Sequence, residues 1–164
     1  MPVTTKAPLG ADTLNRKWYV DINTGTYETP TWVSVFGIME LKALQEATTQ
    51  DSSDFDGEGW KSETVTAQTW GLEGKLRRGV TTADPEAYDP GQELIRLASI
   101  EMGPLNTLDI RFYEHTPGGP QVEAYRGRVG CSWTPEGGGM DALDTVAFKL
   151  SGQGKRTAIV HPAA

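Results

Sequence analysis

The sequence contains little of the chemistry that builds metal sites and disulfide frameworks. Its 164 residues include one cysteine, Cys131, and two histidines, His115 and His161. A single cysteine cannot form an intramolecular disulfide, which favours a reducing compartment. Neither histidine has a second histidine, a cysteine or a carboxylate at zinc-ligand spacing, so no metal site is predicted there. Cys131 falls on the apolar side of a predicted strand beside Trp133, which indicates a buried structural thiol rather than a nucleophile.

Long hydrophobic runs are absent too. No apolar stretch approaches the roughly 20 residues that a membrane-spanning helix needs. The first residues, Met-Pro-Val-Thr-Thr-Lys, lack the apolar segment of a secretory signal. We therefore expect a chain that is made in the cytoplasm and does not itself bind a membrane.

Basic residues are outnumbered by acidic ones. Lysine and arginine total 15 against 22 aspartates and glutamates, which gives a net charge of −7. Proteins that hold nucleic acid through its phosphates need a basic surface, so this charge argues against such binding. The acids gather between Glu40 and Glu63, where seven of them accompany only two bases. Lys75, Arg77 and Arg78 follow, and an acidic edge beside a basic edge suits a head-to-tail contact between copies.

Motifs for catalysis and cofactor binding are missing as well. The sequence has no glycine-rich phosphate loop ending in Lys-Ser/Thr and no Gly-x-Ser-x-Gly turn. No catalytic residue, cofactor or metal ligand is therefore predicted. A small β-fold hydrolase with paired carboxylates is the enzyme alternative, although the acids lie in a Gly/Ser-rich loop that offers little rigid support.

One acidic stretch has part of the calcium-loop pattern. Asp54, Asp56 and Gly57 are followed by Glu63 at the spacing of such a loop. Ser52 replaces the first aspartate, and the residues after Glu63 favour a strand rather than the helix that normally follows. A solvated acidic loop is the favoured interpretation, and cation binding between Asp54 and Glu63 stays open.

The hydrophobic pattern predicts one mainly β domain. Residues 1–15 form an N-terminal arm, residues 16–160 the domain and residues 161–164 a C-terminal tail. The domain is expected to be an antiparallel β-sandwich or open barrel with one packed α-helix. Strands are expected at Arg16–Ile22, Thr31–Leu41, Thr64–Arg77, Leu108–Phe112, Tyr125–Trp133, Val146–Leu150 and Thr157–Val160.

Two parts of the first half carry specific expectations. Apolar residues at both parities of Thr31–Leu41 predict a strand that is covered on both faces. Residues 43–62 are polar and acidic, which predicts a long loop, and Gly71 or Gly74 is expected to mark a bulge in the strand that follows.

The helix is predicted over residues 89–102. Asp89 is expected to be its N-cap, Pro90 fits the first helical position, and Gln92 stands where the partner of a capping box belongs. Apolar residues then recur at helical spacing until Gly103, which is expected to end the helix.

The order of these elements resembles that of the major tail tube proteins of long, non-contractile-tailed bacteriophages, the siphophages. The likeness covers nearly the whole chain and is a distributed pattern rather than a single motif. It is carried by Asn15–Val20, Trp32–Ile38, the acidic loop Asp51–Gly59, the glycine-containing strand Glu63–Arg78, the helix near 90–102 and Leu108–Glu114.

The resemblance implies a structural protein that assembles into stacked hexameric rings. In that family, strands of six subunits close a barrel around a channel, here expected to be negatively lined and to pass DNA without binding it specifically. The matching inter-ring loop would be residues 43–62, and the arms would be residues 1–15 and 154–164. The expected partners are the chain itself, a tape measure protein, a tail terminator and tail-tip proteins. The expected location is the virion tail, after synthesis in the cytoplasm of a host bacterium.

A carbohydrate-binding β-sandwich is the alternative function. Trp60, Trp70 and Tyr88 could each stack on a sugar ring. Aromatic residues of a strand protein more often belong to its core or to an interface, so the tertiary structure decides between the two.

Overall fold

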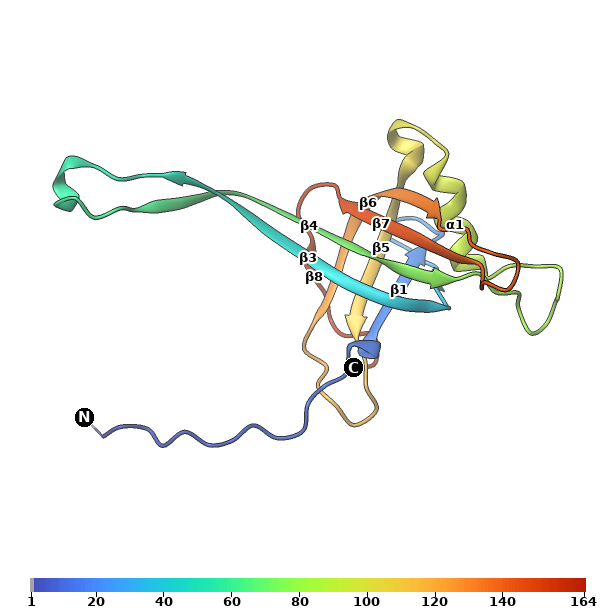
Figure 1. Ribbon diagram of the computed structural model, residues 1–164, viewed down its shortest axis with the longest axis horizontal. Helices are drawn as coiled ribbons and strands as arrows, with labels where there is room; N and C mark the ends of the chain where they lie inside the picture. The colour runs from blue at the N-terminus through green and yellow to red at the C-terminus, as the bar shows by residue number, and fades with distance from the viewer. Residues whose placement is uncertain (1) are drawn as a thin grey trace.

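The computed structural model describes residues 2–164, and an antiparallel sheet of eight strands dominates them (Figure 1). Within these residues, one α-helix lies against the sheet. The predicted mainly β class with one packed helix is confirmed. The strands are β1 (Trp18–Asn23), β2 (Trp32–Ser34), β3 (Ile38–Asp51), β4 (Glu63–Arg77), β5 (Thr107–Glu114), β6 (Ala124–Pro135), β7 (Thr145–Gly152) and β8 (Thr157–Ala158). The helices are α1 (Pro90–Ser99) and the short 3-10 helices η1 (Asn15–Lys17), η2 (Phe55–Gly57) and η3 (Gly103–Asn106).

The sheet is rolled so that its two outer strands approach each other at one corner. The strand order is β2-β1-β5-β6-β7-β4-β3, and β8 pairs with β6. β2 and β3 are the two ends of this order, yet only residues 35–37 join them, a connection that spans at most about 14 Å. A 2.8 Å hydrogen bond from the Asn15 side-chain amide to the Leu41 carbonyl also ties the start of β1 to β3. The strands therefore form one continuous rolled sheet, as in an open barrel.

The hydrophobic core fills the inside of the rolled sheet. Ile110 and Phe112 of β5 are completely buried, as their alternation with charged neighbours predicts. Leu72 and Leu76 of β4 belong to the same apolar cluster, and so does Ile95 of α1. The helix therefore closes the barrel by placing its apolar stripe on the core.

The start of α1 confirms the predicted N-cap but not the capping box. The Asp89 carboxylate accepts a 3.1 Å hydrogen bond from the backbone N–H of Gln92. The side chain of Gln92 does not return this bond, because its amide is buried and donates to the carbonyls of Phe36 and Arg77, both at 2.8 Å. The glutamine thus fixes the helix to the corner between β2 and β3. The helix ends at Ser99, three residues before the predicted end at position 102.

The segment Thr31–Leu41 is not the single two-sided buried strand that we expected. It divides into β2 and the start of β3, with a break at Gly37, whose φ of +80° is strained for any side chain. Phe36 and Met39 on either side of this break are exposed. The break is needed because the chain here passes from one end of the sheet to the other.

Two further predictions about β3 and β4 are wrong. Residues 43–51 are not loop but the second half of β3, so only residues 52–62 connect the strands of a long hairpin. The register shifts lie between Ile38 and Glu40 and between Thr48 and Thr49, not at Gly71 or Gly74. Figure 1 shows this hairpin projecting far from the body of the molecule.

The N-terminal residues extend away from the barrel, whereas the C-terminal residues are docked on it. Residues 2–14 form no helix or strand, are exposed, and extend away from the body (Figure 1). The other expected arm, residues 154–164, is instead docked: Ala158 pairs with Tyr125 of β6, and His161 is buried. A tail that is held by its own barrel is not free to reach a neighbour.

Candidate assembly surface

The β3–β4 hairpin has a proximal part that belongs to the sheet and a distal part, residues 46–69, that projects beyond it. Residues 71–77 of β4 pair with β7, whereas the rest of β4 pairs with β3 alone. β3 has β4 as its single neighbour over its whole length. The distal hairpin therefore has unpaired backbone groups along both edges, and such edges are templates for pairing with another chain.

The distal hairpin has almost no apolar support of its own. All residues from Gln45 to Thr69 are exposed, apart from the half-buried Gly57. An isolated two-stranded hairpin is marginally stable in water, because neither face is covered. The strands are rich in threonine, which favours extended backbone. Length and exposure together indicate a segment that gains stability by contact with another molecule.

Backbone and hydroxyl groups together hold the base of the hairpin's end loop. The Ser52 N–H donates to the Ser62 carbonyl at 2.9 Å, and the Ser62 N–H donates to Ser53 Oγ at 2.8 Å. Thr64 Oγ1 and Ser52 Oγ lie 3.0 Å apart across the two strands. These bonds give residues 52–62, which we name the tip, a defined shape despite their exposure.

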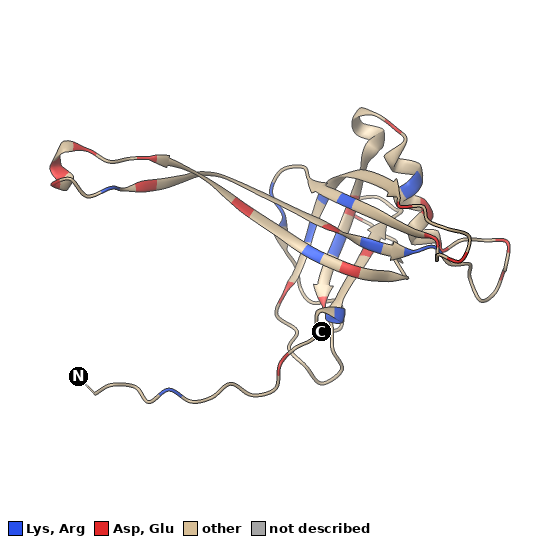
Figure 2. Cartoon of the chain, in the orientation of Figure 1, with Lys and Arg blue, Asp and Glu red and all other residues tan. Residues whose placement is uncertain are grey.

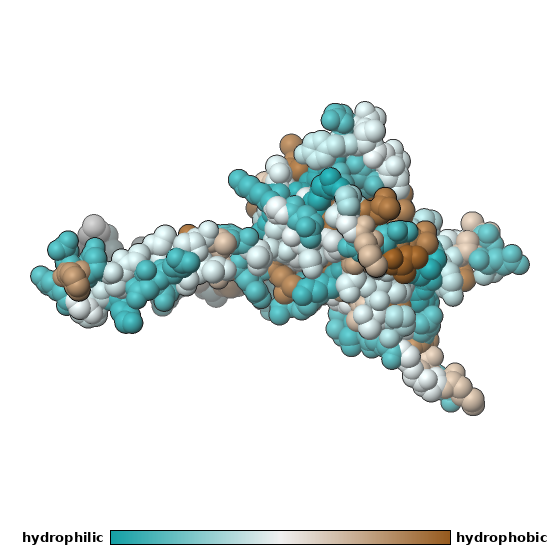
Figure 3. Space-filling model, turned by 90° about the horizontal axis from the view of Figure 1, so that it is seen from above, coloured by the Kyte–Doolittle hydropathy of each residue, from teal (hydrophilic) through white to brown (hydrophobic). Residues whose placement is uncertain are grey.

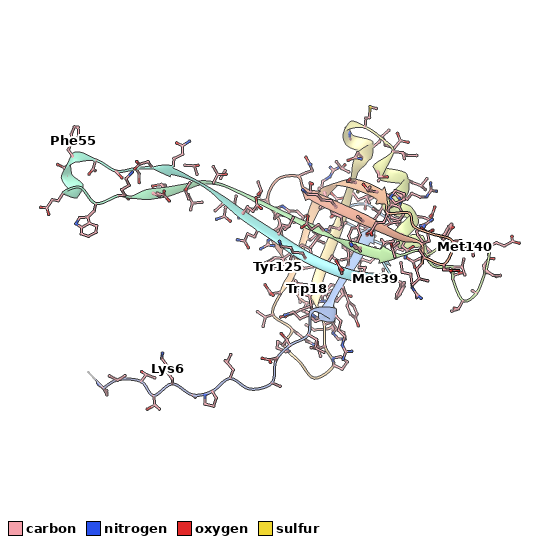
Figure 4. The ribbon with its side chains drawn as sticks, viewed as in Figure 1. Lys6, Trp18, Met39, Phe55, Tyr125 and Met140 are labelled. Carbon is pink, nitrogen blue, oxygen red and sulfur yellow. The ribbon has the colours of Figure 1, made fainter. Side chains whose placement is uncertain are left out.

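Two large aromatic side chains stand out on this polar tip. Phe55 is fully exposed and Trp60 is 81% exposed. Figure 4 shows Phe55 at the far end of the hairpin, pointing away from the strands. In the hydropathy view, the hairpin is mostly teal and white, with brown atoms at its tip (Figure 3). Exposed aromatics on a projecting segment are typical of protein contacts.

The acidic tip is organised by a helix cap at Asp54. The Asp54 carboxylate accepts hydrogen bonds from the backbone N–H groups of Asp56 and Gly57, at 3.1 and 3.0 Å, and so caps η2. Within residues 2–164, no group of three or more Asp, Glu, His or Cys side chains is placed to hold a metal ion. The helix-cap role accounts for the position of Asp54.

Negative charge is concentrated toward the tip, as Figure 2 shows. Asp51 and Glu63 are the last cross-strand pair before the tip. Like charges that face each other across two strands repel. The Asp51 carboxylate also accepts a hydrogen bond from the Ser53 N–H at 2.8 Å. Hydrogen bonding to Ser53 lowers the pKa of Asp51, so the carboxylate stays charged to lower pH than an ordinary aspartate.

The predicted basic edge at residues 75–78 is partly engaged within the chain, whereas Arg77 is exposed. Arg78 is buried against α1 and forms a 2.7 Å ion pair with Glu93. Its guanidinium also lies 3.7 Å from the centre of the Tyr88 ring. Lys75 pairs with Glu136 at 3.5 Å. Arg78 therefore stabilises the body of the protein, and Lys75 and Arg77 stay exposed. The head-to-tail contact inferred from this cluster stays a prediction.

The outer face of the sheet carries both signs of charge. Lys42, Glu73 and Lys149 lie side by side on β3, β4 and β7. Glu40 and Lys75 form the next row. This broad face is near neutral, and the negative charge of the chain lies mainly on the hairpin.

The three aromatic residues of the carbohydrate alternative do not share a surface. Trp60 belongs to the tip. Tyr88 lies in the connection before α1, where its ring stacks on the guanidinium of Arg78. Trp70 lies at the opposite end of the hairpin from Trp60, where its indole N–H donates to the Gly154 carbonyl at 2.7 Å. The three aromatics therefore do not form a single sugar-binding platform.

The cysteine and the histidines occupy structural positions. Cys131 is buried in the core, and burial raises the pKa of its thiol to about 12. His115 and His161 do lie together, with ring centres 6.0 Å apart, although nothing in their spacing along the chain predicted it. Among the described residues, no helix is long and apolar enough to cross a membrane.

Comparisons with known proteins place the fold but no family. No family model matches the chain, and no curated protein sequence matches it. A chain in the tail of an empty gene transfer agent particle, refined with C6 symmetry, superposes with a TM-score of 0.64 at 8% identity, over 91% of this chain and all of that one. A chain of the anti-feeding prophage baseplate superposes with a TM-score of 0.59 at 8% identity, over 94% of this chain and 99% of that one. A chain of the PVC extracellular contractile injection system's sheath-tube complex gives a TM-score of 0.53 at 12% identity, over 90% of this chain and 93% of that one. The chain therefore has a phage-like tail tube fold, found here in both a gene transfer agent tail and contractile injection systems.

Proposed function

We propose that this chain is a structural tail tube subunit that assembles with its own copies into stacked hexameric rings. The observation that carries the proposal is the fold, which matches a chain of a tail refined with C6 symmetry over nine-tenths of this sequence. We place the tube in the virion tail of a long, non-contractile-tailed bacteriophage, on the resemblance of the sequence pattern. The subunit would be synthesised in the host bacterium's cytoplasm.

Ring formation would satisfy the unpaired edge of the sheet. β3 is 14 residues long and has a neighbour on one side only. In a ring, a strand from the adjacent copy would pair with this edge, and closure around six copies would leave no edge exposed. Work of this kind needs shape and backbone hydrogen bonds, not a catalytic group.

Stacking of the rings would use the segments that project from the body. The β3–β4 hairpin extends beyond the sheet, and residues 2–14 are exposed and extend away from the body (Figure 1). Contacts of one ring with the next are heterologous and do not close, so they produce a tube whose length another component must set. A tape measure protein, a tail terminator and tail-tip proteins are the proposed partners.

The charge of the subunit suits a conduit for DNA. Each copy has a net charge of −7 and would repel the phosphate backbone at close range. The near-neutral outer sheet face does not supply this charge by itself. We propose that acids on the hairpin strands outside its end loop, Glu46, Asp51 and Glu63, contribute the negative lining where they lie within the stacked assembly, so DNA would pass without specific binding.

Electron microscopy of negatively stained protein tests the proposal. Rings and tubes should appear as the concentration of the purified chain rises. A protein that remains monomeric at high concentration, even after addition of sonicated tube fragments or a tail-tip nucleus, would contradict it.

A truncated variant separates ring formation from stacking. Replacing residues 46–69 with an Asn-Gly turn removes the distal hairpin and keeps the pairing of Gln45 with Trp70. Because the removed residues contribute nothing to the core, the variant should fold with unchanged stability and form rings that do not stack. Normal tubes from this variant would show that the hairpin has no part in stacking.

A further inference from the structure

A groove with two basic residues lies at the root of the hairpin. We name it the root groove; it has a volume of about 710 Å³. Its lining includes Gln68 and Trp70 of β4 and the loop residues Gly154, Lys155 and Arg156. No acidic side chain lines this groove. It is therefore a positively charged site on a chain whose overall charge is negative.

The root groove is a built feature rather than an accident of the surface. The indole of Trp70 lies so close to the backbone of Gly127 and Gly152 that a Cβ on either would clash with it. Its N–H donates to the Gly154 carbonyl at 2.7 Å, which fixes the loop after β7 against the hairpin. This glycine platform holds the wall of the groove in one position.

The two bases in the groove are not neutralised by acids. The Arg156 guanidinium lies 4.1 Å from the centre of the Tyr125 ring and donates to the Gln45 side chain at 2.9 Å. Both of these contacts are with neutral groups. Lys155 is exposed and forms no ion pair with any residue from 2 to 164. The positive charge of the groove is therefore free to attract an anionic group.

The hairpin tip has the complementary chemistry. Asp54, Asp56 and Glu58 are exposed on it, beside the fully exposed ring of Phe55. The tip cannot enter the root groove of its own chain. Six residue steps separate the Gln45–Trp70 pair from the Asp51–Glu63 pair, which is about 20 Å of straight hairpin.

We propose that the tip of one copy docks in the root groove of a second copy. The tip carboxylates would lie against Lys155 and Arg156, and Phe55 would cover the apolar wall beside Trp70. This inference rests on the proposed self-assembly and names the surfaces that meet in stacking. Because the tip and the groove are different surfaces, the contact is heterologous: each copy accepts one neighbour and reaches the next. Between copies of successive rings it would repeat along the tube without closing.

The arrangement also relates hairpin length to the geometry of the assembly. Successive copies would be offset by the distance from the groove to the tip, about 20 Å of paired strand plus the length of the end loop. Salt would weaken the contact, because its charged groups are only partly buried.

Cross-linking tests which surfaces meet. Gly57→Cys places a thiol on the tip, where a Cβ has ordinary space, and Gln68→Cys places one in the groove. The double variant, assembled and treated with a short bifunctional thiol reagent, should give a ladder of covalent multimers. Gly57→Cys alone should give none, and neither should Gly57→Cys combined with Met140→Cys, since Met140 lies on an exposed loop away from the groove (Figure 4).

Each cross-linking result is decisive. Tubes without a ladder in the double variant would overturn the docking site and leave the proposed function standing. A ladder without rings or tubes would support the docking and overturn the tube. Covalent dimers from Gly57→Cys alone would indicate a tip-to-tip contact and contradict the inference.

Charge reversal with rescue tests the electrostatic part. Lys155→Glu should reduce the ladder by about fivefold or more, and Glu58→Lys in the same chain should restore it, since the two charges are then exchanged. Lys149→Glu is the matched control, because this exposed lysine lies on the sheet face outside the groove. An equal loss with Lys149→Glu, or no loss with Lys155→Glu, would overturn the assignment of the groove.

Discussion

The imidazole of His161 is hydrogen-bonded to the backbone carbonyl of Glu114, 47 residues earlier in the chain. Its other ring nitrogen, Nδ1, accepts a 3.1 Å hydrogen bond from the Ala163 N–H. The neutral ring with its proton on Nε2 satisfies both contacts, because a carbonyl accepts and an N–H donates. His161 also meets the ring of Tyr113 edge-on at 5.3 Å. The C-terminus is thus held on the end of β5.

Replacing this histidine should loosen the C-terminus and lower the stability of the barrel. His161→Ala leaves the Glu114 carbonyl without its buried partner, which should cost about 1–3 kcal/mol in the free energy of unfolding. Urea denaturation measures the change. Val160→Ala is the control, because Val160 is exposed and its change should be nearly neutral. Equal stability of the two variants would show that the histidine does not hold the tail.

The carboxylate of Glu114 should make part of the stability depend on pH. Burial acts to raise its pKa, but hydrogen bonds from the Glu123 and Val122 N–H groups and from Lys17 outweigh this, so the pKa lies below its ordinary value. A carboxyl with a lower pKa in the folded state than in the unfolded state stabilises the fold above the unfolded pKa. This contribution is lost as pH falls below about 4.3 and through the folded pKa.

Glu114→Gln is the variant that isolates this effect. Near neutral pH it should unfold at lower urea concentration than the wild-type chain, and the difference should shrink steadily in acid. Denaturation series between pH 7 and pH 3 give the comparison. A difference that stays constant with pH would mean that the charge of Glu114 contributes nothing.

Gly152 should tolerate no side chain, because Trp70 lies against its backbone. A Cβ there would collide with the indole and displace the N–H that bonds to Gly154. Gly152→Ala should therefore destabilise the fold by about 1–3 kcal/mol, as overpacking does. Gly79→Ala is the control, since a Cβ at Gly79 meets no atom within 4 Å. Similar urea midpoints for both variants would contradict the described packing.

The thiol of Cys131 should be inert in the folded protein. With its pKa raised to about 12 by burial, only about one molecule in ten thousand carries the reactive thiolate at pH 8. A coloured thiol reagent should react in urea but not with the native chain. Adding a cysteine at the exposed neighbouring position, Ser132→Cys, should give one fast-reacting thiol. Fast reaction of the unmodified native chain would show that β6 opens.

The buried strands were predictable because one face of each strand contacts the core and the other contacts water. Apolar and polar residues therefore alternate along the strand. Ile110 and Phe112 alternate with charged residues, and the structure buries both. The Asp89 N-cap was predictable for a similar reason, since the capping bond is made within four residues. Interactions of short range along the chain leave a readable pattern.

The distal hairpin was not predicted because neither of its faces is buried. Residues 43–51 are exposed or nearly so on both faces, so no alternation distinguishes them from a polar loop. The candidate assembly surface depends on contacts between distant residues. Trp70 and Gly154 are 84 positions apart, and the local sequence around either residue does not predict their contact. The same is true of the buried side chain of Gln92, which the local pattern assigned to a cap.

Local patterning alone was enough to establish a mainly β chain with one helix, an acidic balance and a segment of concentrated negative charge. Each of these depends on residue type and short spacing, which the linear order contains. The rolling of the sheet, the projection of the hairpin and the pairing of arginines and lysines with particular acids came from the folded chain. These features arise when strands far apart in sequence share one core, and the free energy of that arrangement depends on all the strands at once.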